Sequence, residues 1–356
     1  MAQLPCSRTI STAPEVTLLP SMFCQPIDIG IDLADNSTQD IPNMEGYPLR
    51  SLGNAIQYIE TLLKIGICTV MVRMDAPSTY KDKHVLLKKQ ASLVQSLRTA
   101  FAPTNLRIIV DPFSIALNAD KTWGIQSKGR LDYLRTAELF SFLTQSFAEA
   151  GADYILTLGR FEREVEIATR TIAALSSTML VSSFSTNTET TNAYVYNCQQ
   201  PYAVTGQKIL VSNYDEMTFR ALLDIYEGTH LVVVKPAENV HVLEKLAALL
   251  THPELLENFL RSDSVKAMVD QANHLRKAYA DMLSGSSVFT LRMRSVSLAS
   301  YAISGTYYMD RQILKRKGQA FLKSLLYERY VTTAAVIVAH GEPLIIDRNA
   351  GWFWMS

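Results

Sequence analysis

Apolar positions along the chain follow two repeating patterns. Short runs rich in β-branched residues alternate with stretches in which apolar residues recur every three or four positions, as at 50–65, 84–101 and 133–150. The first pattern is typical of strands buried on both faces, and the second of amphipathic helices. The runs predict strands at 25–31, 68–74, 106–113, 152–158, 178–186, 230–236, 296–304 and 334–340.

Alternation of strands and helices implies right-handed crossovers and a parallel sheet. Eight such units in 356 residues predict an α/β fold of the (β/α)8 TIM-barrel type. A doubly wound sheet is the alternative, but it favours a glycine-rich phosphate turn, and the sequence has no G-x-G-x-x-G run. We expect 1–23 to form an N-terminal arm and 24–356 the barrel, with a helical insertion at about 238–294 between the sixth and seventh strands.

Composition narrows the class of protein. Hydrophobic residues make up 48% and charged residues 19% of the chain, which excludes a mainly disordered protein. Lysine plus arginine and aspartate plus glutamate both number 34, and this balance disfavours non-specific nucleic-acid binding. The four cysteines lack the spacing of a zinc site, and neither a signal peptide nor a membrane-spanning run is evident. We therefore expect a cytoplasmic protein with neither nucleic acid nor membrane as its partner.

Polar residues at the carboxyl ends of the predicted strands are the candidates for chemistry, because these ends form the active-site face of a TIM barrel. They are Asp111, Asn187, Lys235, Ser304 and His340. Lys235 follows an apolar run and precedes a proline, so desolvation would favour the neutral amine that attacks ketones. A lysine that extends from the strand end into water is the alternative.

Simpler structural roles fit the other candidates equally well. Asp111 precedes a proline and fits a turn, as does the pair Ser304-Gly305, and His340 fits a cap on the last strand. Tyr196, in the polar connection 187–213, is a further candidate for substrate binding. The sequence has no H-E-x-x-H and no G-x-S-x-G motif, which disfavours a histidine-based metal site and a serine hydrolase.

Residues 215–237, DEMTFRALLDIYEGTHLVVVKPA, resemble the strongest signature of the porphobilinogen synthase (5-aminolevulinate dehydratase) family. Further matches follow in the family's order at 41–46, 148–153, 181–185 and 301–307. The resemblance implies a TIM barrel, an arm that wraps a neighbouring subunit, and a homo-oligomer of two or more chains. It places Lys235 at the Schiff-base lysine, Ser304 at the serine that holds the substrate's carboxylate, and Asp111 at the start of the metal loop.

The sequence departs from the family's pattern in the half of the site that binds the second substrate. Asn187 replaces the second active-site lysine, and Leu158-Gly159 replaces a serine–aspartate pair. The arginines that clamp the second carboxylate have no counterpart, and the tyrosine after the last strand becomes His340 or Gly341. The metal-loop positions carry residues that offer no ligand, namely Phe113, Ile115 and Trp123. We expect neither an active-site metal nor a cofactor.

The leading hypothesis is a divergent, metal-independent Schiff-base enzyme of the aminolevulinate dehydratase type. It would bind 5-aminolevulinate or a related small keto acid on Lys235 for dehydration or condensation in specialised metabolism. Asp111 would then be catalytic, while Ser304, Asn187, Tyr196 and His340 would bind the substrate. The alternatives are a non-catalytic homologue that binds a ligand or a partner protein, and an ordinary porphobilinogen synthase.

Overall fold

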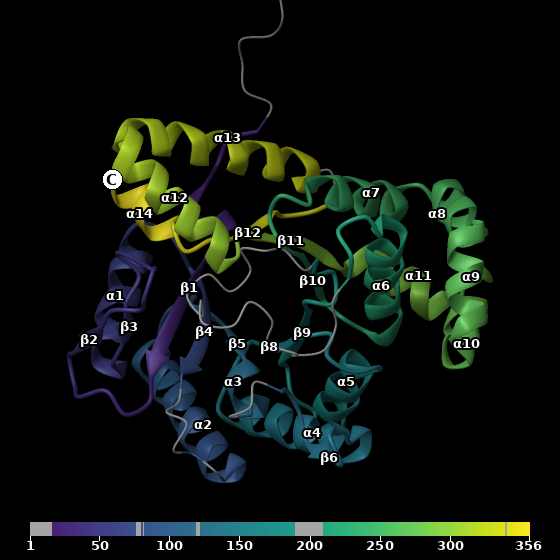
Figure 1. The fold of residues 1–356 in the computed structure, drawn as a ribbon, viewed down its shortest axis with the longest axis horizontal. Helices are drawn as coiled ribbons and strands as arrows, with labels where there is room; N and C mark the ends of the chain where they lie inside the picture. The colour runs from purple at the N-terminus through teal and green to yellow at the C-terminus, as the bar shows by residue number, and fades with distance from the viewer. Residues whose placement is uncertain (1–15, 76–79, 81, 119–121, 189–208, 339) are drawn as a thin grey trace, which may run out of the picture.

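Eight parallel strands close into a barrel in the computed structural model, which describes residues 16–75, 80, 82–118, 122–188, 209–338 and 340–356 (Figure 1). The strands are β1 (Phe23–Gly30), β4 (Thr69–Asp75), β5 (Arg107–Asp111), β8 (Tyr154–Thr157), β9 (Leu180–Ser183), β10 (Leu231–Val234), β11 (Ser297–Tyr301) and β12 (Leu344–Ile346). Each pairs in parallel with the next, and β12 pairs with β1 to close the ring. The predicted TIM barrel is confirmed.

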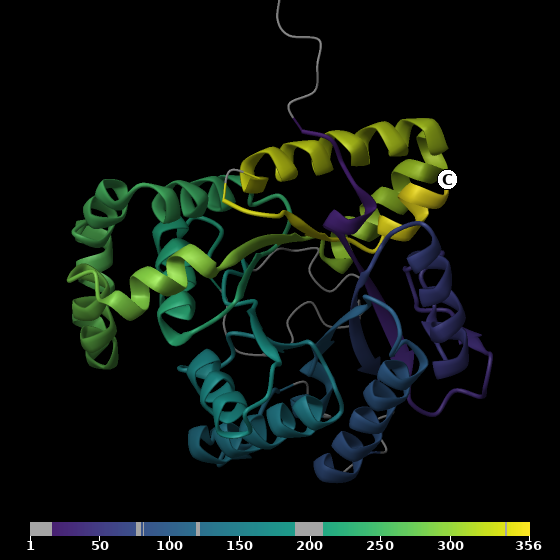
Figure 2. The ribbon, with the colours of Figure 1, turned by 180° about the vertical axis from the view of Figure 1, so that it is seen from behind.

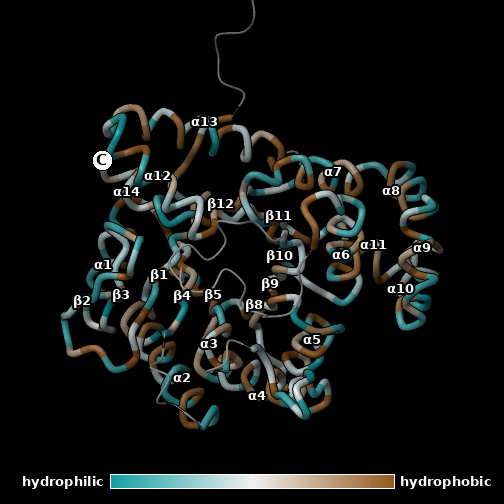
Figure 3. Tube along the Cα trace, viewed as in Figure 1, coloured by the Kyte–Doolittle hydropathy of each residue, from teal (hydrophilic) through white to brown (hydrophobic). Residues whose placement is uncertain are grey.

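Helices surround the barrel on the outside, as the two opposite views show (Figures 1 and 2). Those that connect successive strands are α1 (Leu52–Lys64), α2 (Lys83–Ala100), α4 (Tyr133–Glu149), α5 (Glu164–Ala174), α6 (Tyr214–Glu227), α7 (Val240–Thr251), α12 (Ser304–Lys317) and α13 (Gln319–Val338). Hydropathy alternates along their turns, because one face packs on the strands and the other meets water (Figure 3). In α1, for example, Ala55, Ile59 and Leu62 are buried, and the Ser51 side chain caps the first turn by accepting from Asn54 N.

Short strands, short helices and 3-10 turns lie in the connections between the barrel strands and the long helices. They are β2 (Thr38–Gln39), β3 (Leu49–Arg50), α3 (Phe113–Ala116), β6 (Gln126–Ser127), β7 (Arg130–Leu131), α14 (Ala350–Met355) and the 3-10 turns Pro20–Met22 and Asn273–Leu275. The β3 strand pairs with β1 at Ile29, so the loop that precedes α1 is anchored against the first barrel strand.

The chain between β10 and β11 is helical, as predicted. After α7 it forms α8 (Pro253–Leu260), α9 (Asp263–Gln271), α10 (Arg276–Leu283) and α11 (Ser287–Ser295). These helices share a second hydrophobic core with α6, in which Leu222, Leu246 and Phe289 are buried. They lie beside α6 at the edge of the molecule (Figure 1). The division of the chain at residue 23 stays a prediction, because residues 1–15 are outside the described part.

The prediction of the eighth strand was wrong. Residues 334–338 form the last turns of α13, and the strand that closes the barrel is β12, some ten residues further on. A short apolar run cannot be assigned to a strand or a helix by its pattern alone. Here Ala334 and Ile337 are buried at helical spacing while Val338 is half exposed, which is the pattern of one helix face.

No helix in the described part of the chain is long and apolar enough to cross a membrane.

Candidate functional site

Three charged side chains lie next to one another inside the barrel. Asp28 of β1 pairs in register with Arg73 of β4, and Arg73 pairs with Asp111 of β5. Residues in register on parallel strands point to the same face. Phe23, of opposite parity to Asp28, packs its ring against Tyr330 on the helical side, so Asp28 and its two partners point into the barrel. Arg73 forms an ion pair with Asp28.

Lys235 lies directly after β10, at the carboxyl ends of the strands. Its backbone N–H donates to the Thr186 carbonyl at 3.0 Å, and its own carbonyl accepts from Thr188 N at 3.2 Å. The side chain is buried, with Nζ 4.3 Å from the centre of the Phe184 ring. Strand pairing therefore continues past β9 and β10 and fixes the lysine within the barrel mouth.

Burial lowers the pKa of Lys235 from its ordinary value of 10.5 to about 7. That value is the net result of burial and of the nearby charges. The positive charge of Arg160 also lowers this pKa, whereas the carboxylates of Asp111 and Glu164 raise it. Near neutral pH about half of the lysine is therefore a free amine. The side chain of Lys235 is thus removed from solvent, as the sequence predicted.

Asp111 ends β5, and its charge and that of Lys235 act on each other. Burial raises the pKa of the Asp111 carboxyl, while the charges of Arg73 and Lys235 and the hydrogen bond from Phe113 N lower it. That N–H donates to Asp111 Oδ1 at 2.9 Å, which fixes the carboxylate at the strand end. The structure thus brings together the two residues that the sequence singled out as catalytic.

Aromatic rings connect Lys235 to an arginine after the last strand. Phe184 stacks on Tyr301 of β11 with 5.4 Å between ring centres. The Arg348 guanidinium lies 5.5 Å from the Tyr301 ring and 5.1 Å from the Tyr47 ring. Burial raises the pKa of Tyr301 to about 12, so its hydroxyl stays protonated and can donate a hydrogen bond.

A second buried acid lies at the start of α5, after the loop that follows β8. Glu164, the first residue of α5, accepts hydrogen bonds from Leu158 N at 2.8 Å and Arg160 N at 3.0 Å. Burial raises its pKa to about 7, against the lowering effect of these two N–H groups and of the Arg160 charge. Glu164 and Arg160 therefore place a weak acid and a permanent cation within electrostatic range of Lys235.

The remaining predicted residues fall in different places. Asn187 is backbone-paired beside Lys235, at an isolated parallel bridge. Ser304 is the buried first residue of α12, which begins three residues after the end of β11. Thr306, in the same turn, donates to Glu238 Oε1 at 2.9 Å. Tyr196 lies outside the described residues.

The position of His340 does not support the prediction that it binds the substrate. It follows α13, and its Nε2 lies 3.1 Å from the carbonyl of Val296, the residue that precedes β11. This contact puts the imidazole at the amino ends of the strands, opposite Lys235. His340 became a candidate through the misplaced eighth strand, whereas the residues that reach the carboxyl end after β12 are Asp347 and Arg348.

Sequence reasoning missed Asp28, Arg73, Phe184, Tyr301 and Arg348. Asp28 and Arg73 carried a signal, since each is a charged residue inside an apolar strand (PIDIG and VMVRMD). Such a residue is buried only when it is paired. Arg348 could be found only once the eighth strand was correctly placed.

The residues after β5 do not fit the metal that the family resemblance implies. Ile115 and Trp123 are buried hydrophobic side chains, and Trp123 Nε1 donates to the Phe113 carbonyl at 3.3 Å. None of these side chains offers the thiolate, imidazole or carboxylate that a divalent ion requires. In the described ranges, no three His, Cys, Asp or Glu side chains are grouped as metal ligands. A metal-free site stays a prediction.

Comparison with known proteins supports the fold. No protein-family model matches the chain, and no curated protein sequence matches it. The structure is similar to that of δ-aminolevulinic acid dehydratase (porphobilinogen synthase) from Toxoplasma gondii, with a TM-score of 0.72 and 15% sequence identity over 96% of this chain and 86% of the other. The carboxyl transferase domain of Rhizobium etli pyruvate carboxylase matches with a TM-score of only 0.37 and 9% identity, over 92% of this chain and 40% of the other.

The fold and the interior side chains thus define a TIM-barrel α/β protein with a buried lysine at the carboxyl ends of its strands. Its barrel is like that of porphobilinogen synthase. At 15% identity the likeness is one of fold.

Proposed function

We propose that this protein is a metal-independent Schiff-base enzyme, a divergent relative of porphobilinogen synthase, that binds 5-aminolevulinate or a related small keto acid on Lys235. The observation that supports this most is the position of Lys235. It is buried at the carboxyl end of β10, its pKa is about 7, and the charge of the Asp111 carboxylate acts on it. A lysine of this kind is nucleophilic at neutral pH.

The residues around Lys235 supply the parts of imine formation. The neutral amine attacks the ketone carbon, and a proton moves from nitrogen to oxygen to give a carbinolamine. The Asp111 carboxylate then takes the remaining N–H proton and passes it to the departing hydroxyl, water leaves, and the C=N bond forms. Asn187, whose backbone is bridged to that of Lys235, would hydrogen-bond the carbinolamine oxygen.

The substrate's carboxylate is assigned to the first turn of α12. Ser304 offers a hydroxyl there, and the first N–H groups of a helix have no partner within the helix. The 14-residue helix adds the positive end of its dipole. A ketone at Lys235 and a carboxylate at Ser304 would fix both ends of a short keto acid, and such positioning is the main requirement for imine formation.

Reductive trapping tests the proposal. The protein is incubated at pH 8 with 5-aminolevulinate or levulinate, reduced with borohydride, and digested for peptide mass mapping. We expect an adduct on the peptide that contains Lys235 and none in Lys235→Met. Lys83→Met is the matched control, because Lys83 is also partly buried, with a pKa lowered by burial and Nζ donating to the Ile115 carbonyl at 3.0 Å.

Two results would contradict the proposal. Absence of any adduct with a panel of small keto acids would favour a non-catalytic homologue, and an adduct that persists in Lys235→Met would place the chemistry elsewhere. Formation of porphobilinogen from two 5-aminolevulinate molecules, at a rate typical of a synthase, would favour the ordinary enzyme instead.

A further inference from the structure

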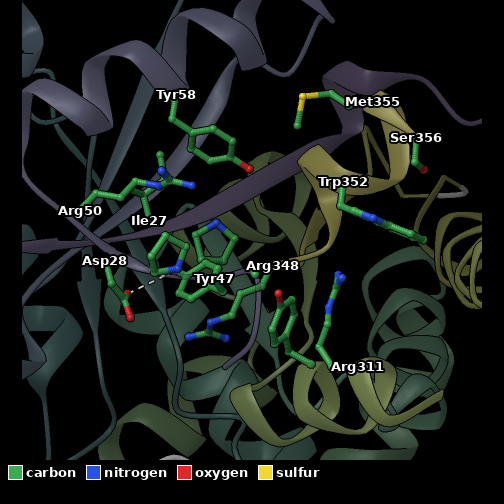
Figure 4. A pocket seen from close by; sticks show the side chains of 14 residues that line it. Ile27, Asp28, Tyr47, Arg50, Tyr58, Arg311, Arg348, Trp352, Met355 and Ser356 are labelled. Carbon is green, nitrogen blue, oxygen red and sulfur yellow. Dashed lines mark hydrogen bonds between the residues drawn. The ribbon is translucent and has the colours of Figure 1, made fainter. Parts of the chain in front are cut away.

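A second pocket lies where β1 and β12 separate. The two strands pair only at Phe23–Ile345 and Cys24–Ile346, after which β1 continues to Gly30 while the chain leaves β12 for α14. The space between them is a cavity of about 270 Å³, lined by residues of β1, α1, α12 and α14 and of the loop at 46–48. Figure 4 shows these side chains arranged around a common centre.

Arginines from three separate elements line this pocket. They are Arg50 at the end of β3, Arg311 in α12 and Arg348 after β12. Each guanidinium lies against an aromatic ring of the same pocket, at 4.1 Å for Arg50 over Tyr58, 4.6 Å for Arg311 over Tyr307 and 5.1 Å for Arg348 over Tyr47. A stacked guanidinium is held in one plane, so its N–H edge is aimed before a ligand arrives.

The positive charge of the pocket is not balanced by its own residues. Among the described residues that line it, Asp28 is the single side-chain carboxylate, and the terminal carboxylate of Ser356 accepts a hydrogen bond from Lys323 Nζ. Asp28 already forms an ion pair with Arg73 and accepts a hydrogen bond from Tyr47 Oη at 3.3 Å. Arg50 donates to the neutral Asn54 Oδ1 at 2.6 Å, and Arg311 to the neutral Asn349 Oδ1. Three guanidinium groups therefore share two carboxylates, each of which already pairs with a cation outside the pocket lining.

Two of the arginines also have unused donors. Arg311 and Arg348 are 7% and 5% exposed, and the Nε atom of each is buried without a hydrogen-bond partner in the described structure. A buried donor without a partner is costly, and a buried cation without a counter-ion is costlier. An anion in the pocket would offset the positive charge of these guanidinium groups.

We propose that this pocket binds the phosphate group of a small phosphate monoester. Guanidinium edges match phosphate oxygens in pairs, and several converging arginines suit a group with two negative charges. The loops after the seventh and eighth strands form phosphate sites in many TIM barrels, and here Arg348 follows the eighth strand while Arg311 lies in the helix after the seventh. The proposal is independent of any imine at Lys235.

The remaining lining residues indicate which kind of group carries the phosphate. Ile27, Trp352 and Met355 line it with apolar surface. A cavity of about 270 Å³ has the volume of about nine liquid water molecules, which is room for a phosphate and a small ring but not for a nucleotide. We therefore expect a monoester of a small, flat or apolar alcohol.

Calorimetric titration of the full chain with phenyl phosphate, inorganic phosphate and benzoate tests this assignment. We expect phenyl phosphate to bind more tightly than either of the others, since only it offers both a dianion and a ring. Arg50→Gln should weaken its binding about tenfold, because one charge-assisted contact is lost. Arg311→Lys, which keeps the charge but not the fork, should also weaken it.

Arg316→Gln is the matched control, since Arg316 is an exposed arginine of the same helix as Arg311. Its affinity for phenyl phosphate should equal that of the wild type. Equal affinity of wild type, Arg50→Gln and Arg311→Lys would overturn the site, as would failure of phenyl phosphate to bind at millimolar concentration. Benzoate that binds as tightly as phenyl phosphate would overturn the choice of phosphate, and inorganic phosphate that does so would overturn the role of the apolar wall.

Discussion

Replacement of Lys235 by methionine should stabilise the protein, and the gain should depend on pH. Methionine has about the length of the lysine stem and carries no charge, so the substitution removes the buried ammonium with little change in packing. In the wild type the pKa of Lys235 is about 7 when folded and near 10.5 in the unfolded chain. The unfolded chain therefore binds one more proton than the folded chain between these two values.

The sign and size of the effect follow from this difference. Below pH 7 both states are protonated and the folded state carries the full cost of the buried charge. Between pH 7 and 10.5 that cost declines as pH rises, and above 10.5 it is gone. At about 1.36 kcal/mol for each pKa unit, the fall from 10.5 to about 7 corresponds to about 5 kcal/mol. That value already includes the attraction of Asp111 and Glu164, so it is the net cost of the charge.

Urea unfolding of the wild type and of Lys235→Met between pH 6 and 9.5 measures this effect. We expect the variant to be more stable by several kcal/mol at pH 6, and its advantage to shrink by about 1.4 kcal/mol for each pH unit above 7. Taking the difference between the two proteins cancels the titration of other buried groups, such as Glu227, whose pKa burial raises to about 8. A difference that stays constant across this range, or a variant less stable at pH 6, would refute the reasoning.

Two further predictions concern the region beside the second pocket. Gly351→Ala should destabilise the protein by about 1–3 kcal/mol in urea unfolding, because an added Cβ would lie 2.5 Å from Tyr58 Oη and 2.9 Å from Leu62 Cδ2. Unchanged stability would contradict the close packing of α14 on α1. Arg329→Met should lower the free energy of unfolding by about 3–5 kcal/mol at pH 7, because the guanidinium makes two 2.9 Å contacts to the buried carboxylate of Asp310. Arg170→Met, which breaks an exposed ion pair, should lower it by less than about 1 kcal/mol. Equal losses in the two variants would disprove a buried ion pair.

The sequence predicted the barrel because seven of its strands are mostly apolar and largely buried on both faces. Such runs stand out between amphipathic helices, and the predicted ranges overlap β1, β4, β5, β8, β9, β10 and β11. The eighth strand has only three residues, Leu344–Ile346, and follows a 20-residue helix that ends in a longer apolar run, residues 334–338. Pattern alone could not separate the two, because tertiary packing decides which run pairs with β1.

The candidate site was predictable to the extent that it depends on strand ends. Lys235 and Asp111 each close a strand, and strand ends meet on one face of a TIM barrel whatever the details of register. Asp28 and Arg73 lie within their strands, so their contact with Asp111 depends on the registers Asp28–Arg73 and Arg73–Asp111. A shift of one residue in either pairing would turn one side chain to the outside of the barrel. No sequence pattern in a single chain fixes that register.

The charges inside the barrel connect the lowered pKa of Lys235 with its proposed role. The formal charges of Asp28 and Asp111 are balanced by those of Arg73 and Arg348, all of which act on the neighbouring Tyr301. A proton on Lys235 adds a positive charge that this group does not balance, which together with burial favours the free amine. On the proposed function, a keto acid brings one negative carboxylate while its imine, once protonated, carries one positive charge. Substrate binding and imine formation therefore leave the balance unchanged, and this favours the covalent complex over the protonated free lysine.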